Sequence, residues 1–333
     1  MSKPSHRPRS GREIGRRLGP IALLLTGVAV VVAFGWTFAA YRLDLGQARE
    51  RVATGSRVVE TRCGPIEFAQ AGDGAPVLVV HGAGGGFDQG MDFAAPLARR
   101  GLRVIAMSRF GYLRTPLPID ASAAAQADAH ACLLDALGIR RAAIVGASAG
   151  APSALQFALR HADRCSALVL VVPAAYVPRA GGAPPLKTPA WTRLLFDTAL
   201  RSDFLFWLAP RVSRATVLRA ILATPPEVVA EASPAERARV QSMIDHLLPV
   251  SPRRLGLLND AKVTSTLPRE ALESITAPTL AISAADDLFG TFDAARYTAE
   301  HVPSARFVGY PSGGHVWVGH DDELVAEISA FLR

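Results

Sequence analysis

The sequence predicts an α/β fold in which a mostly parallel sheet is flanked by helices. A helical segment is inserted between two strands, and one transmembrane helix precedes the sheet. Three observations predict this class. Short apolar runs alternate with helix-like segments through most of the 333 residues, as in parallel sheets whose strands are joined by helices. The alternation stops at Pro173 and resumes near Ala271. An uncharged apolar stretch near the N-terminus is long enough to cross a bilayer.

The N-terminal segment carries most of the net charge of +7. Residues 18–41 contain no charged side chain, and a helix of about 24 residues exceeds the roughly 30 Å of hydrocarbon in a bilayer. The residues before this stretch include six basic side chains and one acidic side chain: Lys3, Arg7, Arg9, Arg12, Arg16, Arg17 and Glu13. The positive-inside rule therefore predicts a cytoplasmic tail over 1–17, a membrane anchor over 18–41 and an extracytoplasmic domain after them.

Three other interpretations of the apolar stretch remain open. It resembles a cleaved signal peptide, which would give a secreted protein, although it is longer than the usual apolar core of such a signal. Arg16 and Arg17 abut the stretch, as in a twin-arginine signal. A buried core helix is the third alternative. The rest of the chain is nearly neutral, so no nucleic-acid partner is predicted.

The first half of the remaining chain predicts strands in a regular order. After a polar connector over residues 42–56, "RVVETRCG" and "PIEFAQAG" predict two short strands that form a hairpin. The continuous apolar runs "APVLVVHG", "GLRVIAMSRFG", "AAIVG" and "SALVLVVP" are typical of strands buried on both faces. A helix over 122–137 ends at Gly138, which suits a C-terminal cap.

The strand signal is absent from residues 174–270, which predict a helical lid. Apolar and aromatic side chains are concentrated in it: Trp191, Leu194, Leu195, Phe196, Phe204, Phe206 and Trp207. They either pack the helices together or form the wall of an apolar pocket. Strands resume with "APTLAISAADD" and "ARFVGYPSGGH", and "DDELVAEISAFLR" predicts the last helix. The predicted core therefore comprises residues 57–173 and 271–333.

Several short motifs follow the predicted strands. Ser148 lies between Gly146 and Gly150 at a strand-to-helix turn, where small neighbours permit a tight turn that exposes the serine oxygen. His81 and Gly82 precede "AGGG", the acidic pair Asp286 and Asp287 follows "TLAISAA", and His315 follows two glycines. Ser, Asp and His occur in this order along the chain, each group near the end of a predicted strand.

These motifs resemble those of the α/β-hydrolases with a helical lid, and the resemblance covers residues 57–333. It implies that Ser148 is a nucleophile and that His315 is the base that takes its proton. A carboxylate must orient the imidazole. The family's acid commonly lies three residues after a glycine; Ala284 stands at that place, which favours Asp287, with Asp286 as the alternative acid.

The resemblance also implies an oxyanion hole made of main-chain N–H groups. Ala149, the residue after the nucleophile, would supply one donor. The loop after His81 would supply the other, from Ala83 or alternatively Gly84. His81 itself is expected to be structural. Arg109, in "SRFGY", is expected to be an ion-pair partner, with a substrate contact as the alternative.

The predicted function is that of a membrane-anchored serine hydrolase, like an esterase or lipase, that cleaves an apolar small-molecule ester through an acyl-enzyme. An acyltransferase, a carbon–carbon bond hydrolase or a cofactor-free haloperoxidase would use the same residues. A non-catalytic binding protein of this fold is the alternative from another class. No HExxH or phosphate-binding motif occurs, so no metal and no cofactor are expected. The oligomeric state and the physiological ester are left open.

The three cysteines, Cys63, Cys132 and Cys165, have no metal-binding spacing. They are expected to be small buried apolar side chains. One disulfide is possible in an oxidising compartment, but the sequence does not select a pair.

Overall fold

The computed structural model describes residues 11–178, 198 and 200–333, and the side chains of this part from residue 23 onward. The chain divides into two compact units, residues 1–47 and 48–333. The predicted basic tail at Lys3, Arg7 and Arg9 lies outside the described residues. So do the predicted aromatic and leucine side chains of residues 191–196.

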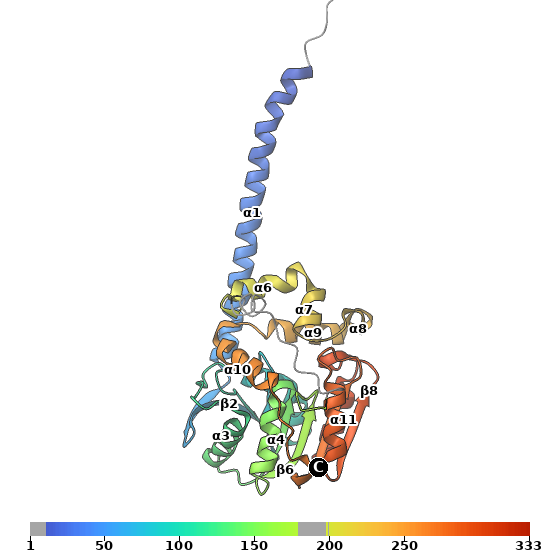
Figure 1. Ribbon diagram of the computed structural model, residues 1–333. Coiled ribbons are helices and arrows are strands. Elements are labelled where there is room, and N and C mark those ends of the chain that lie inside the picture. Colours follow the sequence, from blue (N-terminus) through green and yellow to red (C-terminus); the bar gives the residue numbers. More distant parts are fainter. Residues whose placement is uncertain (1–10, 179–197, 199) are drawn as a thin grey trace, which may run out of the picture. The chain divides into compact units, whose positions relative to one another are not determined.

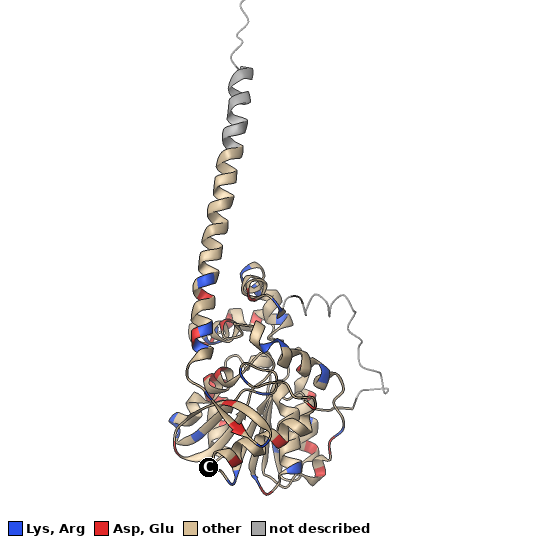
Figure 2. Cartoon of the chain, turned by 90° about the vertical axis from the view of Figure 1, so that its left-hand side faces the viewer, with Lys and Arg blue, Asp and Glu red and all other residues tan. Residues whose placement is uncertain are grey.

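Helix α1 (Gly11–Ala53) accounts for the described part of the first unit. Within Leu23–Ala53 it is long and apolar enough to cross a membrane, and its most apolar 18-residue window has a mean hydropathy of 2.1 and no buried side chain. A signal sequence would meet the same criteria. In Figure 2 the described part of α1 shows no charged side chain until close to its C-terminal end. The helix continues without a break to Ala53, so most of the predicted polar connector over 42–56 is helical.

The second unit is built on one eight-stranded sheet with the order β1-β2-β4-β3-β5-β6-β7-β8 (Figure 1). β2 pairs antiparallel with β1 and β4, and the other strands pair in parallel. The hairpin and the parallel sheet that the sequence predicts are therefore present. The strands are β1 (Arg57–Thr61), β2 (Gly64–Ala71), β3 (Ala75–Val80), β4 (Leu102–Met107), β5 (Ala142–Ala147), β6 (Cys165–Val171), β7 (Thr279–Ala284) and β8 (Ala305–Tyr310).

Helices cover both faces of the sheet, as its doubly buried strands require. Along β3, Val77 and Val79 point to one face, while Leu78 and Val80 point to the other. The first face packs on α2 (Phe87–Arg99) and α12 (Asp321–Phe331). The second face packs on α3 (Ala123–Ala136), α4 (Ala151–Arg160) and α11 (Thr291–His301). Because successive side chains of a strand point to opposite faces, the single apolar run of β3 contributes to two cores, one on each face of the sheet.

The segment between β6 and β7, called the insertion below, is helical where it is described. Its helices gather at one end of the sheet (Figure 1). The helices within residues 214–245 share a small apolar core that includes Val217, Val240 and Ile244. The described helices of the insertion are α6 (Asp203–Val212), α7 (Arg214–Ala220), α8 (Pro226–Glu231), α9 (Pro234–Asp245) and α10 (Arg254–Ser265).

A disulfide joins Cys63, at the turn of the β1–β2 hairpin, to Cys132 on α3. The expectation that the cysteines are three buried apolar side chains is therefore correct only for Cys165, which is buried and free. Burial raises the pKa of its thiol to about 12, so Cys165 is unreactive at neutral pH. The bridge ties the edge hairpin to the helix layer.

His130 is a fully buried titratable group between α3 and α4. Its Nε2 lies 3.1 Å from Ser153 Oγ, which donates to the carbonyl of Gly150 at 3.1 Å. Burial lowers the pKa of His130 to about 3, because a charged ring would lose its hydration. His130 is therefore neutral in the fold, and it supports the start of α4.

Replacement of His130 by glutamine is expected to flatten the acid dependence of stability. The folded pKa lies below the unfolded value of about 6.5, so the contribution of this group is complete above pH 6.5 and is lost as the pH falls toward 3. One proton corresponds to a slope of up to about 1.4 kcal/mol per pH unit. Urea unfolding of the full chain in detergent at pH 7, 6, 5 and 4 measures the slopes. Equal slopes in wild type and His130→Gln would contradict this assignment.

Candidate active site

Each polar group that the motifs single out lies just after the carboxyl end of a parallel strand. His81 follows β3, Ser148 follows β5, Asp287 follows β7 and His315 follows β8. Because parallel strands end at the same edge, the sheet brings side chains far apart in sequence to one place. The insertion lies over the same edge (Figure 1).

Ser148 occupies a strained turn between β5 and α4. Its φ of 48° is in the left-handed region, which a serine adopts only at a cost of about 1–3 kcal/mol. Close packing requires glycine on both sides. A Cβ at Gly146 would lie 2.6 Å from Cβ of Ala154, and a Cβ at Gly150 would lie 2.5 Å from the carbonyl oxygen of Val80. The turn is thus fixed by contacts with α4 and with the end of β3.

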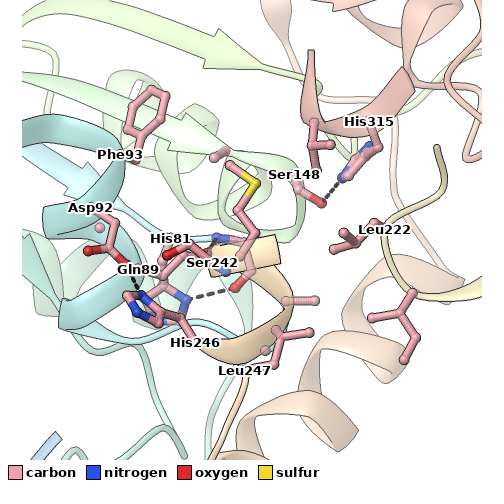
Figure 3. A pocket seen from close by; sticks show the side chains of 18 of the residues that line it. His81, Gln89, Asp92, Phe93, Ser148, Leu222, Ser242, His246, Leu247 and His315 are labelled. Atoms are coloured by element: carbon pink, nitrogen blue, oxygen red, sulfur yellow. Dashed lines mark hydrogen bonds and ion pairs between the residues drawn. The ribbon is translucent and has the colours of Figure 1, made fainter. Parts of the chain in front are cut away.

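Ser148, His315 and Asp287 form a continuous hydrogen-bonded chain. His315 Nε2 lies 2.8 Å from Ser148 Oγ (Figure 3). On its other side, His315 Nδ1 lies 2.7 Å from Asp287 Oδ2. Asp287 and His315 are buried. The acid is held in turn, because Phe289 N–H donates to Oδ1 at 2.8 Å and the Thr291 hydroxyl donates to Oδ2. A carboxylate on Nδ1 fixes the tautomer in which Nε2 can accept the serine proton.

Asp286, the alternative acid, has a different environment. Its carboxylate accepts hydrogen bonds from the main-chain N–H of Gly314 at 2.7 Å and of Gly313 at 3.2 Å. These residues directly precede His315. Asp286 therefore holds the loop that carries the imidazole.

Four side chains hold the loop over residues 81–86 through hydrogen bonds to its main chain. Gly82 N–H donates to Gln89 Oε1 at 3.0 Å. The Arg109 guanidinium donates to the carbonyls of His81 at 2.9 Å and Gly82 at 3.1 Å. Gly84 N–H donates to the hydroxyl of Tyr112 at 3.2 Å. The fourth contact comes from the insertion, where Arg253 donates to the carbonyl of Gly85 at 2.6 Å.

Ala83 differs from its neighbours Gly82 and Gly84, whose main-chain N–H groups have side-chain acceptors. Among the described residues, none accepts a hydrogen bond from its main-chain N–H, and Ala83 lines the pocket beside Ser148. Gly84, the alternative donor, already uses its N–H on Tyr112. Ala149 lies in the first turn of a short 3-10 helix, Ser148–Gly150, where the first N–H groups have no partner within the helix. The main-chain N–H groups of Ala83 and Ala149 are therefore both without an acceptor among the described residues.

His81 and Arg109 have structural partners. The Nε2 atom of His81 accepts from Arg109 N–H at 3.0 Å, and Nδ1 lies 2.7 Å from the carbonyl of Gly82. Burial, reinforced by the Arg109 charge, holds the pKa of His81 well below its usual value. Arg109 forms a buried bidentate ion pair with Asp260 on α10, at 2.6 and 2.7 Å. Both residues therefore agree with the structural expectation from the sequence.

A pocket of about 700 Å³ opens beside Ser148 and His315. Most of the residues that line it are apolar, including Leu222 and Leu247 from the insertion (Figure 3). Its far side carries a paired histidine and carboxylate, His246 and Asp92. Among the described lining residues, Arg239 is the one arginine or lysine.

Arg239 is not available as a free cation. Its guanidinium lies 2.9 Å from Glu236 and 3.6 Å from Asp321, and it donates to the carbonyl of Val316 at 2.8 Å. The pocket therefore offers an anionic ligand little uncompensated positive charge. In the described part of the chain, no group of three or more His, Cys, Asp or Glu side chains is arranged to hold a metal ion.

The aromatic side chains of the insertion divide between the two predicted roles where they are described. Phe206 lines the pocket. Phe204 and Trp207 stack on each other with ring centroids 6.0 Å apart, which is packing between neighbouring turns of α6. Trp191 and Phe196 lie outside the described residues.

Fold and motifs together define the class of protein. The profile of the alpha/beta hydrolase fold family matches residues 75–318, and the chain belongs to this family. It is 25% identical, over 78% of this chain and 91% of the relative, to the uncharacterized hydrolase YcgS of Bacillus subtilis (strain 168). It is 26% identical, over 79% of this chain and 91% of the relative, to 2-hydroxy-6-oxononadienedioate/2-hydroxy-6-oxononatrienedioate hydrolase 2 of Pseudomonas putida.

A solved structure agrees with this membership. An alpha/beta hydrolase fold protein from Nakamurella multipartita superposes with a TM-score of 0.65 at 28% identity. The match covers 83% of this chain and 98% of that chain.

The sequence did not indicate four residues that hold the site: Gln89, Tyr112, Arg253 and Asp260. Arg253 and Asp260 resemble ordinary polar residues of a helical segment, and no local motif marks them. Tyr112 was within the quoted "SRFGY" segment but had no assigned role. Their partners lie up to 168 residues away along the chain, so only the folded structure identifies them.

Proposed function

We propose that this protein is a membrane-anchored serine hydrolase of the esterase or lipase type, which cleaves an apolar ester through an acyl-enzyme. The proposal rests on the hydrogen-bonded chain from Ser148 through His315 to Asp287. An apolar pocket opens at the Ser148 end of this chain. Nucleophile, base and orienting acid stand in the order that a serine hydrolase requires.

In the acylation step, Ser148 Oγ attacks the ester carbonyl carbon while His315 Nε2 takes its proton. The carbonyl oxygen becomes an oxyanion, which accepts hydrogen bonds from the N–H groups of Ala83 and Ala149. Asp287 stabilises the imidazolium that forms. His315 then gives its proton to the departing alkoxide, so that the alcohol leaves and the acyl group stays on Ser148.

In the second step, water attacks the acyl-enzyme and His315 takes the water proton. Collapse of the second oxyanion releases the carboxylic acid and returns the proton to Ser148. An alcohol in place of water would give acyl transfer on the same residues, which makes an acyltransferase the first alternative. A carbon–carbon bond hydrolase is the second.

The lining of the pocket favours a neutral apolar substrate. The relative from Pseudomonas putida is named for dioate substrates, which carry two carboxylates. Here Arg239 is already occupied by Glu236 and Asp321, and a buried carboxylate without a partner is costly. This observation supports an ester with an apolar acyl or ring group over a dianionic substrate. A non-catalytic binding protein would not require the contact between Ser148 and His315.

Substitution of Ser148 by alanine tests the proposed activity. We expect a fluorophosphonate probe to label the wild-type chain and not Ser148→Ala, because the label bonds to the serine oxygen. Hydrolysis of 4-nitrophenyl esters should fall by at least about 10³-fold. Ser329→Ala serves as the matched serine control, since Ser329 is on α12 and its hydroxyl donates to the carbonyl of Val325 within that helix. A wild-type chain that is neither labelled nor active on an acetate-to-dodecanoate series would contradict the proposal in favour of a binding protein.

The two acids are separated by paired substitutions. Asp287→Asn is expected to lower kcat by about 10⁴-fold, because the amide no longer selects the productive tautomer of His315. Asp286→Asn should lower kcat far less, by about tenfold or below, since it affects the loop and not the imidazole. Measurement of kcat for both variants on one 4-nitrophenyl ester decides between them. A larger loss in Asp286→Asn would reverse the assignment.

The anchor and its orientation are part of the proposal. The length and hydropathy of α1 support a membrane-spanning segment within residues 18–41, and the basic residues before it support a cytoplasmic N-terminus. The Cys63–Cys132 disulfide independently supports an extracytoplasmic hydrolase domain, because disulfides persist in oxidising compartments. Secretion after cleavage of the segment is the alternative, and residues 174–270 are proposed to act as a lid.

Counting thiols tests the location. Denatured chains from membranes, treated with a maleimide polymer without reductant, should gain one adduct at Cys165 and three after reduction. Cys63→Ser should gain two adducts without reductant, which controls for the pairing. Intact mass of the mature chain reports whether residues 18–41 remain. Three adducts without reductant would place the domain in a reducing compartment and contradict the proposed orientation.

A further inference from the structure

Arg253 is an unusual residue for an inserted segment, because its side chain has no exposed surface. It lies in the short turn before α10, and its guanidinium reaches the loop after β3. A buried arginine is costly unless its charge and its donors all find partners. The partners of Arg253 therefore indicate why it is there.

All the donor nitrogens of Arg253 are used. Nε donates to the carbonyl of Pro249 at 3.1 Å. One terminal nitrogen donates to the carbonyl of Gly85 at 2.6 Å and to Asp88 at 3.1 Å, and the other donates to Asp88 at 2.7 Å. Asp88 is buried in the first turn of α2. Burial alone would raise the pKa of Asp88, but the Arg253 charge holds it below its usual value, so the pair is ionic.

Arg253 thus holds Gly85, near the end of the loop over residues 81–86, and Asp88, in the first turn of α2. The Gly85 carbonyl lies two residues after Ala83, and Asp88 begins the helix that follows. On the other side, Arg109 and Gln89 hold Gly82. Ala83 N–H is the donor between these two held points. An oxyanion donor is effective only if it is already positioned before the charge forms.

We propose that Arg253, supplied by the insertion, is a positioning residue for the oxyanion hole: its bond to the Gly85 carbonyl and its pair with Asp88 fix the Ala83 N–H. The inference rests on the proposed function, because it assigns a role in stabilising the oxyanion. It makes the insertion part of the catalytic machinery as well as a cover of the pocket.

Two variants of the full chain in detergent test the proposal. Arg253→Lys keeps the charge but lacks the planar fork that holds Asp88 and Gly85 together. The double variant Arg253→Gln with Asp88→Asn removes both charges of this pair, so that neither partner is left as an unpaired buried charge; Arg51, which lies 3.6 Å from Asp88, keeps its hydrogen bond to the carbonyl of Leu248. Arg164→Lys is the remote control, because Arg164 also binds two carbonyls and a carboxylate, at the far edge of the sheet.

The expected result separates positioning from folding. Loss of a whole oxyanion donor costs about 10²–10³ in kcat, so a displaced donor in Arg253→Lys and in the double variant should cost about 10- to 100-fold. KM should change by less than about threefold, because the substrate is bound by the apolar pocket. The inhibition constant of a trifluoromethyl ketone, which forms an oxyanion on Ser148, should rise by the same factor as kcat/KM falls. Arg164→Lys should stay within about threefold of wild type.

Several outcomes would overturn the inference while leaving the proposed function intact. They are a folded Arg253→Lys with wild-type kcat, an equal loss in Arg164→Lys, or a loss of kcat that the ketone affinity does not follow. Failure of both Arg253 variants to fold, judged by near-ultraviolet circular dichroism, would assign Arg253 to stability alone. A wild-type chain without labelling or turnover would instead remove the proposed function, and the inference with it.

Discussion

The turn at Ser148 is the constraint on which the rest of the site depends. The chain must leave β5 and enter α4 within three residues, and it does so with a positive φ at a serine. That conformation is kept because Gly146 and Gly150 lie against neighbouring backbone and Ala154, where a side chain would not fit. Gly150 lies against the carbonyls of Val80 and His81, at the start of the loop that carries Ala83. The turn at Ser148 and the loop over residues 81–86 are therefore packed on each other.

The insertion is bonded to both loops that flank this turn. On one side, Arg253 and Asp260 reach the segment after β3 through Gly85 and Arg109. On the other, α9 reaches the loop that carries His315, where Arg239 donates to the Val316 carbonyl and Glu236 accepts from Gly319 N–H at 2.8 Å. These contacts are charged and partly or wholly buried, so breaking one partner leaves an uncompensated group. Helices α9 and α10 therefore behave as part of the scaffold of the site.

Periodicity and turn residues were enough to predict the architecture. Short continuous apolar runs such as "VLVV" and "LVLV" are typical of strands that are buried on both faces. The structure confirms the hairpin, the parallel strands and the helices between β6 and β7. Most of the polar connector over 42–56 is helical, which its composition allows, because arginine, glutamate, glutamine and alanine are all good helix formers.

By itself the sequence determined the fold class, the order of serine, acid and histidine along the chain, and the apolar helix before the core. Each depends on local patterns, because spacing of apolar residues and glycines sets local structure. Only the tertiary structure decided that the carboxylate of Asp287 and not of Asp286 meets His315, that the N–H of Ala83 and not of Gly84 is left available, and that Cys63 pairs with Cys132. The contacts of Arg253 with Gly85 and Asp88 are likewise visible only in the tertiary structure. These are choices between near neighbours in sequence, and they depend on directions of single side chains and N–H groups that packing across distant segments fixes.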